Sequence, residues 1–349
     1  MKKWIFAGLF LAAGVVYFVG CQEQQASTKS VRPKSADKLT SVKGSLLLTV
    51  DFNTAVPLKY DFVSERQMSV NLDPSGKYSK GGKGSESQTS SEKLQMQITY
   101  KAKQIDPYGY STIEATCDSA KVTRSANNRG QQGRTDAVES LAGKTFTLKI
   151  TPTGKIVDYS SLDSITKELG EKAFGGDSKR GKVKNPDMIM DFVATQWRIW
   201  DSIASIKKPM DGLKKGQQWQ SQLLAPMPFV SKIGRDVLYK FEGVVESNSI
   251  SCAEITSTYS LSDPNRPLKV VMPYSGSFQM KGMFGFLQGY KMLSIEGTGK
   301  QLYDIEKGLV KSDTQQYKAK VKASIFGLGS DTLEPNIEIN QTITMTLVE

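Results

Sequence analysis

Three cysteines, Cys21, Cys117 and Cys252, are the residues of this chain whose side chains most readily form covalent bonds. A thiolate can be acylated, can bind a metal ion or can pair into a disulfide. The 349 residues contain no histidine, so the commonest general base and the usual zinc ligand are missing. Ser-His-Asp and Cys-His mechanisms both need an imidazole, and the sequence therefore excludes these two classes of enzyme.

Cys21 follows directly on an apolar run near the start of the chain. Two lysines precede the run, and Trp4–Gly20 carries no charge. The run is short for a membrane-spanning helix and has the length of a signal peptide. Its last residues, Phe-Val-Gly, resemble the lipobox of bacterial lipoproteins, whose cysteine is acylated and becomes the new N-terminus. We expect cleavage between Gly20 and Cys21 and lipid on Cys21; the alternative is an uncleaved N-terminal anchor helix.

The segment after Cys21 has the composition of a flexible tether. Residues 22–42 are rich in Ser, Gln and Lys and show no periodicity. We therefore expect residues 1–20 to be the signal peptide and 21–43 the lipidated cysteine with its tether. The folded part would then stand in the bacterial cell envelope, anchored to membrane lipid. Gln22 after the cysteine favours the outer membrane, facing the periplasm or the surface.

Charge and motifs limit the remaining partners. Lys and Arg outnumber Asp and Glu by 46 to 35, a surplus that favours lipid headgroups or acidic glycans, or serves solubility alone. Export makes nucleic acid an unsuitable partner. The chain has no phosphate loop, no dinucleotide fingerprint, no nucleophile elbow and no metal-ligand spacing. We expect no cofactor, no metal and no enzymatic activity.

Strict alternation of apolar and polar residues dominates most of the chain. It is clear in the stretch LQMQITYKA at 94–102, in the paired stretches at 143–160, 237–261 and 297–312, and in the last residues, where Gln341 interrupts it. Alternation of this kind predicts half-buried antiparallel strands. The turn Asp106–Gly109 has proline second and glycine fourth, as a type I turn prefers. The predicted fold is mainly β, with curved antiparallel sheets built from long hairpins.

One central segment has helical spacing instead. Asn185 could cap a helix over 185–206, in which Ile189, Val193, Trp197 and Trp200 recur on one face. A shorter helix around Leu162–Leu169 precedes it. Asp187 and Asp191, one turn apart, suit the start of this helix better than a catalytic pair.

The helices divide the chain into an N-terminal β lobe at 44–160, a helical segment at 161–211 and a C-terminal β lobe at 212–349. The hairpin order on the two sides suggests a duplication into two related lobes. The alternative is one large sheet with many hairpins.

The stretch 273–293 is unusually rich in methionine and aromatic residues. Such side chains repack easily and could line an amphiphile site or dip into a membrane surface. A pair of core strands kinked by glycine is the simpler alternative. Cys117 and Cys252 fall in strands, where they could form a disulfide or remain separate buried thiols. The residues predicted to contact a ligand or membrane are Phe278, Met280, Met283, Phe284, Phe286 and Tyr290.

Two stretches resemble a bacterial family of uncharacterised lipoproteins. They are LAGKTFTLKITPTGKIVDYSSL at 141–162 and GLKKGQQWQSQL at 212–223, the second with its Lys-x-Gly-x-x-Trp motif at Lys214, Gly216 and Trp219. The stretch at 297–312 is similar to a glycine-rich strand of the same family. The family has no assigned activity, so the resemblance implies architecture and an envelope location but no function. A looser analogy joins the fold to half-barrel lipid carriers.

Together these patterns predict a non-catalytic envelope lipoprotein that binds an amphiphilic or other envelope ligand. The alternative is a structural lipoprotein that works with an envelope protein and binds no small ligand.

Overall fold

The computed structural model describes residues 45–52, 56–76, 87–126, 136–174, 188–225, 233–268, 287–326 and 332–348. Every described residue lies in one compact unit, Thr40–Glu349. Gly20, Cys21 and the predicted tether lie outside the described residues. In the part of the chain that is described, no helix is both long and apolar enough to cross a membrane.

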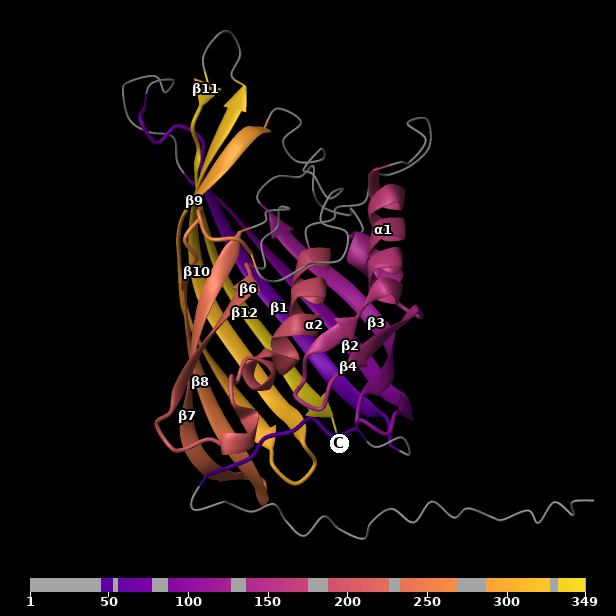
Figure 1. The fold of residues 1–349 in the computed structure, drawn as a ribbon. Helices are drawn as coiled ribbons and strands as arrows, with labels where there is room; N and C mark the ends of the chain where they lie inside the picture. The colour runs from indigo at the N-terminus through magenta and orange to yellow at the C-terminus, as the bar shows by residue number, and fades with distance from the viewer. Residues whose placement is uncertain are drawn as a thin grey trace, which may run out of the picture. The chain divides into compact units, whose positions relative to one another are not determined.

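One curved antiparallel sheet contains the twelve described strands (Figure 1). Eleven follow one another in the order β5-β4-β3-β2-β1-β12-β10-β9-β8-β7-β6, and β11 pairs with β10. The sheet is open between its edge strands, β5 and β6, and the mainly β prediction is confirmed. The strands are β1 Leu58–Asn71, β2 Gln88–Ile105, β3 Ser111–Ala126, β4 Thr145–Ile150, β5 Ile156–Asp158, β6 Gln218–Leu224, β7 Gly234–Ser247, β8 Ile250–Leu261, β9 Leu287–Asp304, β10 Leu309–Phe326, β11 Thr332–Leu333 and β12 Asn336–Val348.

The hairpins lie where the alternation predicted them. The β2–β3 turn closes with the amide of Gly109 donating to the carbonyl of Asp106. Gly154 ends the β4–β5 turn and Gly308 the β9–β10 turn, and all three glycines have positive φ, which suits a residue without a Cβ. The β7–β8 turn instead uses Asn248 and Ser249 at φ values of 51° and 60°.

The two predicted lobes meet in the middle of the sheet. β1 pairs with β12 over its whole length, from Lys59 opposite Val348 to Asn71 opposite Asn336. The strands on the N-terminal side of this pair are β1–β5, and those on the C-terminal side are β6–β12. Both predicted lobes therefore share one continuous sheet, and their origin by duplication stays a prediction.

Two α-helices accompany the sheet. α1 spans Ser160–Phe174 and packs beside β4, and α2 spans Ile189–Ala204 and lies in the hollow of the sheet (Figure 1). Short 3₁₀ helices, η1 Ala137–Leu141 and η2 Pro209–Asp211, flank them. Ile189, Val193 and Trp200 are buried and Trp197 is half-buried. Met188 occupies the N-cap position of α2 without a side-chain capping hydrogen bond. Asn185 and Asp187, which the sequence placed at the start of the helix, lie outside the described residues.

Residues 45–52 form a strap across one end of the sheet, drawn in indigo in Figure 1. The strap is bonded at both of its ends. Leu46 and Leu213 exchange two backbone hydrogen bonds of 2.8 and 2.6 Å, and the amide of Val50 donates to the carbonyl of Pro152. Phe52 is buried with its ring edge-on to Trp200, 5.3 Å between centroids. The strap thus closes this end of the core.

Cys117 and Cys252 are both free, buried thiols. Cys117 lies on β3 and Cys252 on β8, and five strands separate these two in the sheet. Neighbouring strands are about 4.8 Å apart, whereas a disulfide needs Cα atoms within about 7 Å. The disulfide that the sequence left open is therefore not formed, and the alternative of separate thiols describes the structure.

Candidate functional site

Polar side chains interrupt the apolar inner face of the sheet and lie under α2. On β1, Ser64 and Arg66 continue the inward face of Tyr60 and Phe62, and all four are almost completely buried. Gln341 is likewise a buried polar residue on the inward face of β12. Buried polar groups are costly unless they are hydrogen-bonded, so each of these side chains needs a partner. The partners come mainly from α2 and from neighbouring strands.

The first group is a chain of alternating charges that we call the ion chain. Arg66 donates through Nη2 to Asp191 of α2 at 2.6 Å and through Nη1 to Glu92 of β2 at 3.3 Å. Arg124 of β3 donates to Glu92 at 2.8 Å and also to Asp136, the cap of η1. The ion chain therefore links α2, three strands and η1 across the hollow of the sheet.

Neutral side chains complete the contacts of Asp191. Ser64 and the Gln341 side-chain amide both donate to its Oδ2 atom at 2.7 Å. Burial raises the pKa of Asp191, and the Arg66 guanidinium and the Ser64 hydrogen bond act in the opposite direction. Asp191, which the sequence assigned to helix-end charge, is instead the centre of a buried network.

Asp136 makes the stability of the fold depend on pH. Burial raises its pKa to about 6, against the opposing effect of Arg124. The folded-state pKa lies above that of the unfolded chain, so this group stabilises the fold fully below pH 4. That stabilisation is lost as the pH rises through about 6. The loss is on the order of 2–3 kcal/mol at most.

We expect Asp136→Asn to remove this pH dependence, because asparagine also caps helices but does not ionise. Urea unfolding of both proteins between pH 4 and pH 7 measures it: the variant should gain stability relative to the native protein as the pH rises. A relative gain by the native protein would mean that pairing with Arg124 outweighs burial.

The second group, which we call the tyrosine–arginine cluster, lies at the C-terminal half of α2. Arg198 pairs with Asp313 of β10 at 3.0 Å and donates to the hydroxyls of Tyr239 and Tyr259. Its guanidinium carbon is 5.2 Å from the centroid of the Tyr239 ring. Arg198 is thereby held from three strands, and the acid and the rings together balance its charge.

Arg235 of β7 belongs to the same cluster and extends over two other strands. It stacks on the Tyr259 ring at 4.6 Å, and its Nη2 atom donates to Gln315 of β10 at 2.8 Å. Glycines on the intervening β9 permit this: a Cβ on Gly299 would be 2.2 Å from the Tyr259 hydroxyl. The Nε and Nη1 atoms of Arg235 have no hydrogen-bond partner in the described part of the chain. A buried donor without a partner costs about 1–3 kcal/mol, so this cluster is not optimised for stability.

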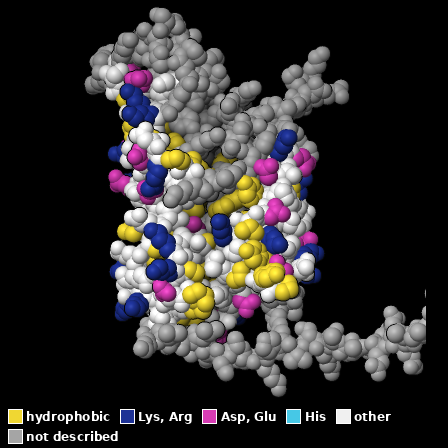
Figure 2. Space-filling view, viewed as in Figure 1, with side chains coloured by type: hydrophobic (Ala, Val, Ile, Leu, Met, Phe, Trp, Pro, Cys, Tyr) yellow, Lys and Arg dark blue, Asp and Glu magenta, His cyan; other side chains and the backbone are white. Residues whose placement is uncertain are grey.

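A cleft of about 940 Å³ runs along edge strand β6, where the sheet is open. We call it the edge cleft. The β4–β5 turn and Tyr159 form one side, α2 the floor, and β6, β7 and β8 the other side. Tyr159 and Trp197 meet edge-on at 5.4 Å between ring centroids. In the space-filling view, apolar side chains gather beside α2 and β4 with charged groups around them (Figure 2).

The tyrosine–arginine cluster reaches the edge cleft through Tyr259. Asp201 and Tyr259 line the cleft, and Asp201 accepts hydrogen bonds from Tyr239 at 2.7 Å and Ser221 at 2.9 Å. Burial raises the pKa of Asp201, and those two hydrogen bonds oppose the rise. A ligand in the cleft would thus meet aromatic rings near Trp197 and a hydrogen-bonding wall at Asp201.

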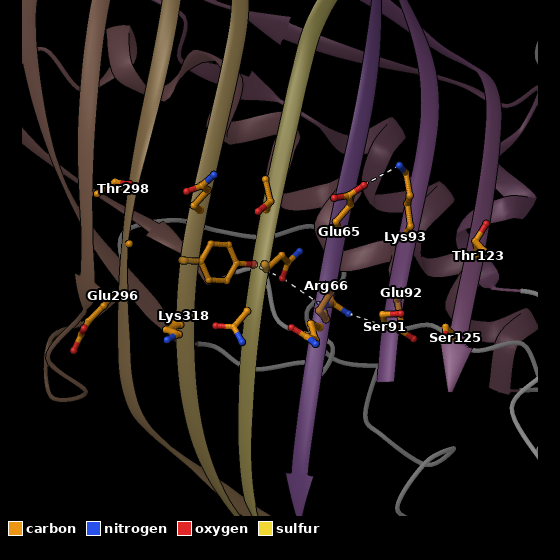
Figure 3. A pocket seen from close by; sticks show the side chains of 17 residues that line it. Glu65, Arg66, Ser91, Glu92, Lys93, Thr123, Ser125, Glu296, Thr298 and Lys318 are labelled. Atoms are coloured by element: carbon orange, nitrogen blue, oxygen red, sulfur yellow. Dashed lines mark hydrogen bonds and ion pairs between the residues drawn. The ribbon is translucent and has the colours of Figure 1, made fainter. Parts of the chain in front are cut away.

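A second groove lies on the opposite face of the sheet, behind the ion chain. It measures about 810 Å³ and is lined by residues of six strands, both exposed ones such as Ser91 and Thr123 and buried ones such as Arg66 (Figure 3). Glu65 and Lys93 form an exposed ion pair across it. Its lining includes long charged side chains, among them Lys93 and Lys318. In the described residues, no group of three or more acidic or cysteine side chains is placed to hold a metal.

Of the six residues predicted to contact a ligand or membrane, the described part of the chain includes Tyr290 alone, by its backbone. Tyr290 lies in β9, where its backbone is opposite Ala323. The structure places in these polar groups Arg66, Arg198 and Asp201, which the sequence did not single out, together with Asp191, which the sequence assigned to helix-end charge. One indication of a buried polar group was visible in the sequence, namely Gln341, which interrupts the apolar face of the last strand. The remaining predicted residues, Phe278, Met280, Met283, Phe284 and Phe286, lie outside the described residues, as do Gly20 and Cys21.

No protein-family model matches the sequence, and no curated protein matches it. Among solved structures, the chain is similar to one described as "Lipid-protein interactions in lipovitellin", with a TM-score of 0.40 and 11% sequence identity. The match covers 86% of this chain and 26% of that chain. This chain therefore spans about a quarter of the lipovitellin chain, and a likeness at this level assigns no function.

Proposed function

We propose that this chain is a lipid-anchored envelope protein whose folded unit binds an amphiphilic ligand in the edge cleft. The observation that carries the proposal is the cleft itself. Its volume of about 940 Å³ is that of a site for a small organic ligand. It lies where the sheet is open, so a ligand can enter without separating any paired strands.

The lining of the edge cleft is amphipathic, as such a ligand requires. Ile156, Val237 and the Tyr159–Trp197 pair offer an apolar side. Asp201 and its hydrogen-bond partners offer a polar inner wall to a head group. Apolar walls with a few convergent polar groups are the usual composition of small-molecule sites.

The anchor part of the proposal rests on the sequence before the folded unit. Cys21 stands after the apolar run, and the described residues begin at Ser45. The residues between them span at most about 80 Å when fully extended. A linker of this length allows the folded unit to work close to the membrane or clear of it.

Native mass spectrometry of the protein purified from a bacterial envelope extract tests the ligand. We expect a bound mass that disappears after organic extraction. Trp197→Ala should lose that mass, because the Trp197 ring lines the cleft and holds Tyr159. Tyr108→Ala is the matched control, since Tyr108 is an aromatic residue that is 83% exposed and outside the cleft. A clean unliganded mass, or equal retention by Trp197→Ala, would contradict the ligand proposal.

Membrane fractionation of Cys21→Ser tests the anchor separately. We expect the variant to accumulate as an unprocessed precursor without lipid. Normal processing and unchanged membrane association would contradict the assignment of Cys21.

A further inference from the structure

Four lysines cluster around η2 with little opposing charge. Lys207, Lys208, Lys214 and Lys215 are all exposed, and none of their ammonium groups has an ion-pair partner in the described part of the chain. Asp211 is the one acid between Lys207 and Lys215 in the sequence, and Glu242 of β7 is a further acid, near enough to Lys215 to interact with its charge. Some surface lysines elsewhere, such as Lys93, Lys103 and Lys300, form ion pairs. The cluster, which we call the lysine face, is therefore a local excess of positive charge.

An apolar side chain stands in the middle of the lysine face. Met210 is 83% exposed at the tip of η2, between the two lysine pairs. An isolated exposed methionine needs no explanation by itself. A methionine surrounded by unpaired lysines has the composition of a surface that contacts anionic headgroups and inserts one apolar side chain between them.

The lysine face is held rigidly by the strap. Leu213, between the two lysine pairs, exchanges backbone hydrogen bonds with Leu46. Gly212 packs so closely that a Cβ there would be 2.8 Å from the Ser45 Oγ atom. Ser45, Lys207, Lys208, Met210 and Lys214 line one groove of about 1010 Å³. The positions of the lysines are thus fixed relative to the start of the strap.

The chain enters the folded unit beside the lysine face. Ser45 is the first described residue, so residues 1–44 are attached at this point. The segment that contains Cys21 therefore joins the folded unit next to the lysines. This is the end of the sheet that the indigo strap crosses in Figure 1. An anchor in a lipid bilayer would hold this end of the folded unit within about 80 Å of the headgroups.

We propose that the lysine face docks on the anionic surface of the bilayer that holds the N-terminal anchor. This inference rests on the proposed anchor and not on the ligand of the edge cleft. Docking would orient that cleft, because Lys207, Gln220 and Leu238 line both the groove of the lysine face and the edge cleft. The edge cleft would then open close to the membrane surface, and an amphiphile could pass between the membrane and the cleft.

Vesicle flotation with residues 40–349 tests the proposal without any anchor. These residues form one compact unit that contains the whole sheet, both helices and the core. The vesicles contain equal parts of phosphatidylglycerol and phosphatidylcholine, or phosphatidylcholine alone. We expect binding only to the first kind, and weaker binding as salt rises from low to physiological strength and above.

A matched pair of variants locates the contact. Each lysine near an anionic surface contributes about a fivefold gain in partition, so replacing all four by glutamine should lower binding about 100-fold or more. Met210→Ser should lower it further. The control replaces four exposed lysines without ion pairs elsewhere, Lys101, Lys121, Lys167 and Lys291, and should change binding by much less.

Three outcomes would overturn the docking proposal. The first is equal binding to vesicles with and without phosphatidylglycerol. The second is an equal loss of binding in the two quadruple lysine variants. The third is release of the protein from phosphatidylglycerol vesicles by a low concentration of heparin, which would favour an acidic glycan as the partner. None of them depends on the bound mass in the edge cleft or on the processing of Cys21. Failure here is therefore distinguishable from failure of the proposed function.

Discussion

Asp191→Ala is expected to lower the free energy of unfolding by about 3–5 kcal/mol, the cost of leaving a buried partner charge uncompensated. The Arg66 side chain is completely buried and pairs with Asp191 at 2.6 Å. Without the carboxylate, Arg66 keeps Glu92 as a charged partner at the longer distance of 3.3 Å. Ser64 and Gln341 would also lose their shared acceptor.

Urea denaturation measures this effect, and the neighbouring strand position provides its control. Glu65 pairs with Lys93 on the exposed face, with both side chains about half in water. Glu65→Ala should therefore cost less than about 1 kcal/mol. The double replacement Arg66→Met with Asp191→Leu should recover much of the loss, because apolar residues of similar size can replace a buried ion pair. If Asp191→Ala cost no more than Glu65→Ala, the ion chain would not stabilise the fold.

Gly297→Ala is expected to destabilise the fold by about 2–3 kcal/mol through overpacking. A Cβ on Gly297 would be 2.2 Å from the carbonyl oxygen of Gln316 and 2.8 Å from the Cα atom of Tyr317. Both atoms belong to the backbone of β10, so the strand itself would have to move. That movement would also disturb Tyr317, which donates to Gln341.

Thermal unfolding compares this variant with Gly143→Ala. Gly143 has a positive φ of 77° and nothing within 4 Å of its Cβ position. Its replacement should cost only about 1 kcal/mol, from backbone strain without a clash. Equal effects at the two positions would show that β9 and β10 can separate to admit a methyl group.

Strand positions could be predicted from the sequence because alternation is a local signal. The hairpin turns at Asp106, Gly154 and Gly308 follow from residue types that neighbour one another in the chain. The helix containing Trp200 follows in the same way from spacing within a few turns. These features do not depend on which strands become neighbours.

The edge cleft and the ion chain could not be predicted, because they depend on contacts between distant segments. Arg66 and Asp191 become partners only once α2 lies in the hollow of the sheet. From the residues of its own strand alone, Arg66 would be predicted to lie on the surface. Asp201 shares its carboxylate with Ser221 and Tyr239 for the same reason. Gln341 broke the alternation visibly, but the pattern alone could not distinguish a buried network from a local irregularity.

The pairing of β1 with β12 also has a consequence for biosynthesis. β1 is the first described strand and β12 the last, so the centre of the sheet joins segments that leave the ribosome far apart in time. Contacts of such high sequence separation form slowly. Until β12 is available, Ser64 and Asp191 also lack Gln341. We expect the chain to complete its fold only after synthesis of β12, which would keep an exported chain unfolded for as long as it must be threaded across a membrane.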